Sequence, residues 1–101
     1  MLNVLKGTKE TGQVWLNGQA LSPKKSQEVT NHSPDGFAWG YGGSGPAQLA
    51  LAVLLELTEE KTALSLYADF KWHYLAPLDI DSDFEISFDT EQVVPKGALE
   101  A

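Results

Sequence analysis

The chain has 101 residues, of which 43% are hydrophobic, and this supplies the core of one compact domain. It contains no cysteine, which excludes disulfides, thiolate metal sites and cysteine nucleophiles. Its formal net charge is -7, and only 7 residues are Lys or Arg. Because phosphate backbones are neutralised by clustered basic side chains, direct nucleic-acid binding is disfavoured, and a basic protein is the better electrostatic complement.

The first third of the chain predicts strands and turns. We expect a strand near residues 2–5 and a hairpin over residues 14–21. Asn17-Gly18 suits a type I′ turn, which needs positive φ at both central positions. Residues 22–29 are polar and predict a loop or a short turn of helix.

The most informative segment is residues 31–55, where a glycine-rich loop runs directly into an apolar helix. Residues 31–36 carry the composition of a tight turn. Alternating aromatics over residues 37–41 predict a short strand with all three rings on one face. The helix is expected to start near Pro46, which suits the first helical position, with Gly45 or Ser44 as its cap.

Two long helices are predicted. The first runs through residues 47–57 and has almost no polar face, so we expect it to be buried on nearly all sides. The second is expected to be capped by Thr58 and ended by Pro77. Helical spacing places one apolar face on it, formed by Ala63, Leu66, Tyr67, Phe70 and Tyr74.

Strict alternation over residues 79–89 predicts a half-buried strand with an acidic outer face. That face consists of Asp79, Asp81, Asp83, Glu85 and Asp89. The carboxylates either protect a solvated edge strand from aggregation or mimic a nucleic-acid backbone for a basic groove on a partner. A calcium loop is disfavoured, because Phe84 and Thr90 replace the glycine and glutamate that such a loop needs.

These elements predict an α+β fold, in which a small antiparallel sheet packs on two helices and the first of them is central and buried. Residues 1–94 would form the single domain, and residues 95–101 a flexible tail. No apolar run reaches the roughly 20 residues that cross a bilayer. The first residues also lack the layout of a signal peptide, so we expect a cytoplasmic protein with no membrane contact.

The junction of loop and helix is the expected contact site. A helix start offers unpaired N–H groups and partial positive charge to an anion, although glycines serve equally well in a purely structural turn. The loop lacks the lysine of a P-loop and the pattern of a dinucleotide fingerprint. The residues expected to contact a ligand or partner are His32, Ser33, Asp35, Trp39, Tyr41, Gly42, Gly43, Ser44 and Gln48.

No catalytic set is complete in this sequence. His32, Ser33 and Asp35 contain the residue types of a hydrolase triad, but neighbours in one turn rarely reach the geometry of nucleophile, base and orienting acid. His73 is expected at the surface. Two histidines with scattered carboxylates make a weak case for a metal, so we predict no catalytic residue, no metal and no cofactor.

Residues 32–55 resemble the signature of a small family known as a domain of unknown function, which occurs in bacteria, phages and other mobile elements. The segment 66–71, with its Tyr-x-x-Phe-Lys pattern, also resembles that family, and the likeness covers residues 13–94. The resemblance implies small size, a single domain and an accessory role in conflict between phage and host, with no established activity. The acidic segment 79–89 is not part of the resemblance.

We therefore expect a non-enzymatic interaction protein that occupies a partner's surface, as an anti-defence inhibitor of a phage or mobile element. The contacts would come from the loop 32–44 and from the acidic partner surface Asp79, Asp81, Asp83 and Glu85. The expected partner is a protein, in particular a basic, nucleic-acid-binding one, and a homodimer stays open. The alternative is a small-ligand protein that holds a nucleotide or other anion at the helix start. Aromatic side chains left exposed near the glycine loop would form a hot-spot surface for a protein or a stacking platform for a base.

Overall fold

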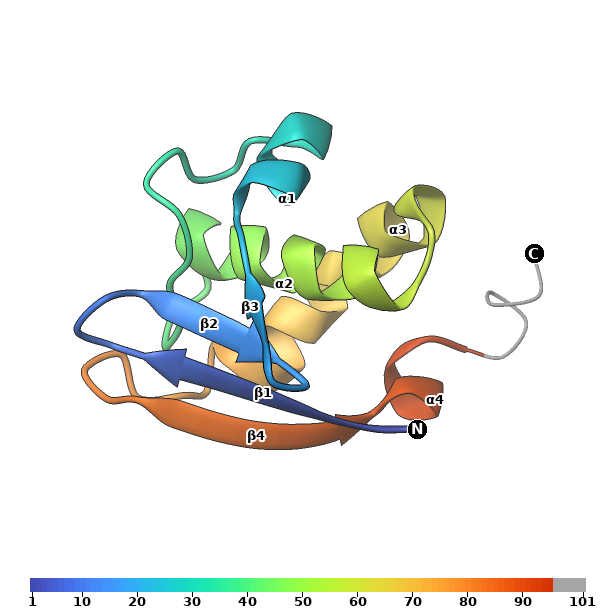
Figure 1. Ribbon diagram of the computed structural model, residues 1–101. Helices are drawn as coiled ribbons and strands as arrows, with labels where there is room; N and C mark the ends of the chain where they lie inside the picture. The colour runs from blue at the N-terminus through green and yellow to red at the C-terminus, as the bar shows by residue number, and fades with distance from the viewer. Residues whose placement is uncertain (96–101) are drawn as a thin grey trace.

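A four-stranded antiparallel sheet of order β3-β2-β1-β4 forms one layer of the computed structural model, which describes residues 1–95 (Figure 1). The strands are β1 (Leu2–Thr8), β2 (Gln13–Leu16), β3 (Gln19–Leu21) and β4 (Phe84–Asp89). The helices are α1 (Lys24–Val29), α2 (Ser44–Leu57), α3 (Glu60–Phe70), the π-helical turn η1 (Lys71–Leu75) and α4 (Thr90–Val93). The predicted α+β class is confirmed.

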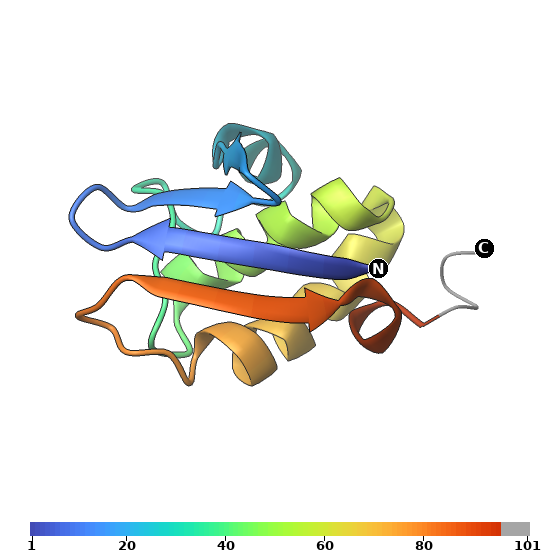
Figure 2. The same cartoon turned by 60° about the horizontal axis from the view of Figure 1, so that its bottom comes forward.

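The helices α2, α3 and η1 cover one face of the sheet, as the view onto the strands shows (Figure 2). The opposite face carries exposed side chains such as Lys6 and Glu85, which form an ion pair of 3.5 Å across β1 and β4. The sheet therefore has one buried and one solvated face, as alternating strands require.

The predicted hairpin is confirmed. Asn17 has a φ of 53° and Gly18 a φ of 82°, the positive values that a type I′ turn needs. Asn17 also fixes the hairpin to β1, because its side-chain oxygen accepts the Val4 N–H at 2.9 Å and its amide donates to the Asn3 side chain at 3.0 Å.

Helix α2 is buried from Gly45 to Leu55, which agrees with its missing polar face. The predicted apolar face of the second helix also enters the core: Ala63 and Phe70 are buried, and Leu66, Tyr67 and Tyr74 pack against them. Helix α2 starts two residues before Pro46, with Gly43 as its N-cap. Pro46 thus lies inside the first turn, where a missing N–H costs no helical hydrogen bond.

One predicted strand and one predicted helix cap are wrong. Residues 37–41 form no strand, and their rings do not share a face, since Trp39 is buried and Tyr41 exposed. Thr58 ends α2, and Glu59 is the N-cap of α3. The second helix reaches Leu75, which agrees with its predicted end at Pro77, but its last turn, η1, is π-helical: Ala76 N–H donates to the Lys71 carbonyl five residues back at 2.8 Å.

The predicted acidic strand over 79–89 is correct only from Phe84 onward. The residues before it form a turn, because the Asp79 carboxylate accepts the Asp81 N–H at 2.9 Å and the Ser82 hydroxyl at 3.0 Å. Side-chain bonds of this kind compete with the ladder bonds of a strand.

The expected tail lies outside the described residues except for Pro95. None of the helices in residues 1–95 is long and apolar enough to cross a membrane.

Candidate functional site

Gln48 fixes the segment that leads to the glycine loop. Its side chain is fully buried in α2, and its oxygen accepts the N–H groups of His32 at 2.7 Å and Ser33 at 2.9 Å. Its amide donates to the Ser26 hydroxyl at 2.8 Å and to the Thr30 carbonyl at 3.1 Å. All polar atoms of this side chain are thus engaged inside the protein, so Gln48 positions the loop rather than contacting a partner.

His32 lies against the Tyr67 ring of α3, with ring centroids 5.0 Å apart. Its Nε2 atom is buried and has no hydrogen-bond partner among the described residues. Asp35 is exposed in the turn, and the backbone N–H of Ser33 donates to the Gln48 side-chain oxygen. His32, Ser33 and Asp35 therefore have separate structural environments, and among the described contacts no hydrogen bond joins their side chains.

The loop 40–43 lies beneath three exposed apolar side chains. A side-chain carbon on Gly42 would overlap the Trp72 ring, and one on Gly43 would overlap the Tyr41 ring. Gly40 has a φ of +88° and lies against Ile80 so closely that an added carbon would stand 2.5 Å from its backbone. Only glycine permits these approaches. We call Tyr41, Trp72 and Ile80 the aromatic patch.

The aromatic patch is open to solvent, with exposed fractions of 42% for Tyr41, 57% for Trp72 and 43% for Ile80. Trp72 lies on η1, and π-helical turns are frequent at functional sites because they redirect side chains. Ile80 enters from the loop that connects η1 to β4. The glycine loop and the chain from η1 to the following loop, about 30 residues downstream, thus present these apolar side chains together.

Charged groups surround the patch. Lys71 Nζ donates to the Gly42 carbonyl at 3.3 Å and lies 4.5 Å from the centroid of the Trp72 ring. Asp79 and Asp81 flank Ile80 in sequence and are exposed. The Asp81 N–H and then the Ser82 hydroxyl lower the pKa of Asp79, which keeps its carboxylate ionised.

The other predicted site residues do not join this patch. Trp39 is 3% exposed and packs edge-on against Phe84, with ring centroids 4.7 Å apart. It donates its ring N–H to the Ser82 carbonyl at 3.0 Å. Asp83 accepts the Lys9 N–H at 2.7 Å. Glu85 pairs with Lys6 on the solvated face of the sheet.

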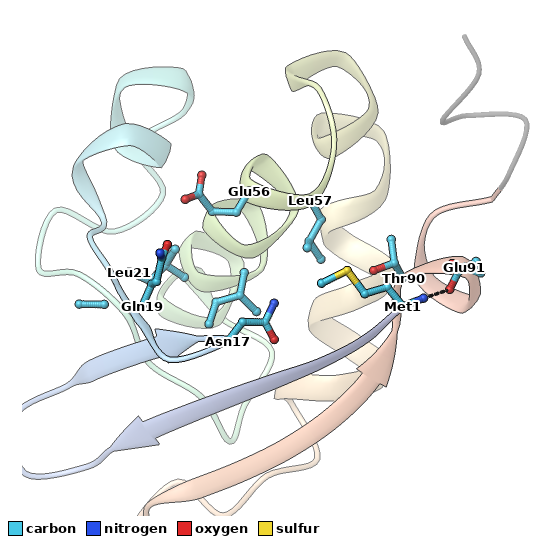
Figure 3. Close-up of a pocket in the computed structure, with 10 residues that line it drawn as sticks. Met1, Asn17, Gln19, Leu21, Glu56, Leu57, Thr90 and Glu91 are labelled. Atoms are coloured by element: carbon cyan, nitrogen blue, oxygen red, sulfur yellow. Dashed lines mark hydrogen bonds and ion pairs between the residues drawn. The ribbon is translucent and has the colours of Figure 1, made fainter.

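A cleft of about 590 Å³ opens at the C-terminal end of α2, between the hairpin and α4 (Figure 3). Its floor includes Leu16 and Leu57, and its rim carries Glu56 and Glu91. These carboxylates already pair, Glu56 with Lys25 at 3.1 Å and Glu91 with the Met1 amino group. None of the residues predicted for the site lines this cleft.

A second cleft, of about 750 Å³, lies on the solvated face of the sheet and is lined by Trp15, Lys6, Asp83 and Glu85 among others. Two acidic residues of the predicted partner surface thus line a hollow, while Asp79 and Asp81 lie in the preceding turn. Within residues 1–95, no three His, Asp or Glu side chains gather as metal ligands.

Sequence reasoning did not assign Lys71, Trp72 or Ile80 to the site. The available signal was the glycine loop itself, because several closely spaced glycines beside aromatic residues indicate bulky neighbours. The sequence could not name these neighbours, since they lie about 30 residues or more downstream of the loop.

Comparison with known proteins agrees with the resemblance noted in the sequence. Searches of curated proteins and of solved structures gave no significant match. The sequence model of a family of unknown function, DUF6166, matches residues 5–96 and so includes the glycine loop, the aromatic patch and all of the sheet except the first three residues of β1. The description of that family names no activity. The chain belongs to the DUF6166 family of unknown function.

Proposed function

We propose that this chain is a non-enzymatic interaction protein whose aromatic patch is the central contact with a partner protein. The observation that carries the proposal is the exposure of Tyr41, Trp72 and Ile80 around one glycine loop. Tyrosine and tryptophan are enriched among the residues that carry most of the binding energy of protein interfaces, and exposed apolar side chains gathered around one loop are typical of a contact site.

The rigidity of the patch supports this role. Trp72 is held from below by Gly42 and from the side by Lys71, and the loop itself is tied to the helix layer by Gly40 N–H, which donates to the Leu75 carbonyl at 2.9 Å. A preorganised aromatic surface binds with a smaller entropy cost than a mobile one.

The charge of the molecule supports a basic partner. The net charge is -7, and Asp79 and Asp81 stand beside Ile80. Negative charge around an apolar contact accelerates association with a positively charged surface and excludes acidic competitors. A nucleic-acid-binding protein has such a surface. The resemblance to a family that occurs in bacteria, phages and other mobile elements is compatible with an accessory role in which covering that surface inhibits a host defence protein.

The alternative proposal, a nucleotide or other anion at the start of α2, has less support. The rings of Trp72 and Tyr41 lie against the glycines that would have to receive the anion, and the Lys71 ammonium group is engaged with the Gly42 carbonyl. Native mass spectrometry separates the two proposals. A small extra mass that disappears on denaturation would support the ligand, and a bare chain would leave the protein partner as the proposal.

The direct test compares protein capture by matched variants. We expect Trp72→Ala combined with Tyr41→Ala to lose the partner that the parent chain captures from its host cell. Leu64→Ala is the control, because Leu64 is 40% exposed on α3 and outside the aromatic patch. Retention of the same partner by the double variant would contradict the proposal.

A further inference from the structure

A second surface is available at the edge of the sheet. Strand β4 has one neighbour, β1, and its six residues form the longer of the two sheet edges (Figure 2). The side chains that point toward the helix layer are Phe84, Ile86 and Phe88, and those on the solvated face are Glu85, Ser87 and Asp89.

The hydrogen-bond register shows which backbone groups point away from the sheet. Thr90 N–H donates to the Met1 carbonyl at 2.9 Å, and bonded and non-bonded pairs alternate from there along β1 and β4. The residues of β4 that bond to β1 are Phe84, Ile86 and Phe88. The residues whose N–H and C=O point outward are Glu85, Ser87 and Asp89.

The side chains of this edge disfavour a second copy of the chain as its occupant. Antiparallel pairing of two β4 strands centred on Ser87 places Glu85 of one copy opposite Asp89 of the other. Like charges directly opposite each other destabilise a strand pair. Glu85 already pairs with Lys6 at 3.5 Å, and Asp89 with the Met1 amino group at 2.9 Å. Both carboxylates are nevertheless exposed to solvent and favour an added strand with Lys or Arg at those two positions.

The helix side of the edge carries the apolar side chains of β4 and, beyond them, a groove of mixed polarity. Phe88 packs against Phe70 and Tyr74, with ring centroids 5.1 Å and 5.7 Å apart. The groove, of about 310 Å³, lies between these helices and α4 and is lined by Leu66 and Val93 but also by Asp69, His73 and Gln92. A strand added to β4 would therefore meet carboxylates on its solvent side and the apolar side chains of β4 on its helix side.

We propose that the β4 edge receives an extended segment of a partner protein, with basic side chains opposite Glu85 and Asp89 and apolar side chains between them. Main-chain hydrogen bonds supply affinity in such strand addition, and alternate side chains supply specificity. This surface goes beyond the proposed function, because it uses none of the side chains of the aromatic patch. The experiment on one surface can therefore contradict its proposal without affecting the other.

A synthetic peptide tests the proposal on the unmodified protein. The probe is Lys-Val-Thr-Val-Lys flanked by glycines and labelled for fluorescence anisotropy, with threonine opposite Ser87. We expect saturable binding that weakens about tenfold when the threonine nitrogen is methylated, because that N–H donates to β4. Methylation of a valine nitrogen, whose N–H points away from β4, should leave the affinity unchanged.

Two further comparisons complete the test. In the protein, Ser87→Pro removes the outward N–H at a position where an edge strand tolerates proline, and should weaken binding, whereas Ser87→Ala should not. A Glu-Val-Thr-Val-Glu peptide should not bind. Equal binding of the two methylated peptides, binding of the acidic peptide, or no saturable binding of the basic peptide would overturn the proposal.

Discussion

The side-chain oxygen of Gln48 accepts the backbone N–H of His32 at 2.7 Å, which ties the start of the turn at residues 31–36 to the buried helix α2. The same oxygen accepts the Ser33 N–H, so one side chain adds to the few backbone hydrogen bonds of this irregular segment, in which His32 N–H also donates to the Thr30 carbonyl at 3.2 Å. The position of the glycine loop therefore depends on a polar group in the middle of an apolar helix.

Replacing Gln48 by methionine should destabilise the fold by about 2–4 kcal/mol, because a similar volume is kept while the Ser33 N–H loses its acceptor, the His32 N–H keeps only the Thr30 carbonyl at 3.2 Å, and the Ser26 hydroxyl and Thr30 carbonyl lose their donor. Chemical denaturation of the variant measures the loss. The exposed Gln92→Met change is the control and should alter the free energy of unfolding by less than about 0.5 kcal/mol. A Gln48→Met protein as stable as the parent would contradict this role.

The apolar side chains of α2 should dominate stability. Leu54 is fully buried, and Leu54→Ala should lower the free energy of unfolding by about 2–5 kcal/mol through lost burial and the cavity left behind. Leu64→Ala removes the same atoms from an exposed site and should have little effect. Similar denaturation midpoints for the two variants would refute the burial of this helix.

The close approach of Gly42 to Trp72 is testable by a double-mutant cycle. Gly42→Ala should displace the Trp72 ring and destabilise the fold by about 1–3 kcal/mol. In a Trp72→Ala background the same change should cost less, because the ring that it overlaps is gone. Additive effects of the two changes would show that the ring does not lie on the glycine.

The turn at residues 79–82 predicts a pH dependence. Hydrogen bonds from the Asp81 N–H and the Ser82 hydroxyl lower the pKa of Asp79. Because the folded-state pKa lies below the unfolded-state value, ionised Asp79 favours folding above the unfolded-state pKa, and this contribution is lost as the pH falls through the folded-state pKa. NMR titration of the carboxyl carbon should show a higher pKa for Asp79 in Ser82→Ala, and an unchanged pKa would contradict the assignment.

Local patterns predicted the elements whose causes are local. The Asn17-Gly18 pair identified the hairpin, since few residue pairs accept positive φ twice, and the unbroken apolar run identified the buried helix α2. Helical spacing likewise selected the buried face of α3. The alternation of acidic and other residues wrongly predicted a strand at residues 79–83. There the Asp79 carboxylate accepts the Asp81 N–H and stabilises a turn instead.

Long-range relationships escaped prediction. The continuation of α3 into η1 has no sequence signal that distinguishes it from ordinary helix, yet it carries Trp72 onto the glycine loop. Gln48 was expected to contact a ligand or partner, whereas it bonds to backbone groups of residues 30–33 and to the Ser26 hydroxyl of α1. Spacing along the chain does not show whether a buried polar side chain will bond to a ligand, to a partner or to backbone groups of its own chain.

Site-specific photo-crosslinking in the host cell tests most directly whether the aromatic patch contacts a partner protein. A benzophenone amino acid at position 72 should give a discrete covalent adduct with one protein, and the same probe at position 64 should not. The adduct should also disappear when Tyr41 is replaced by alanine. The same pattern of adducts from positions 64 and 72, or none from position 72, would contradict the proposed function.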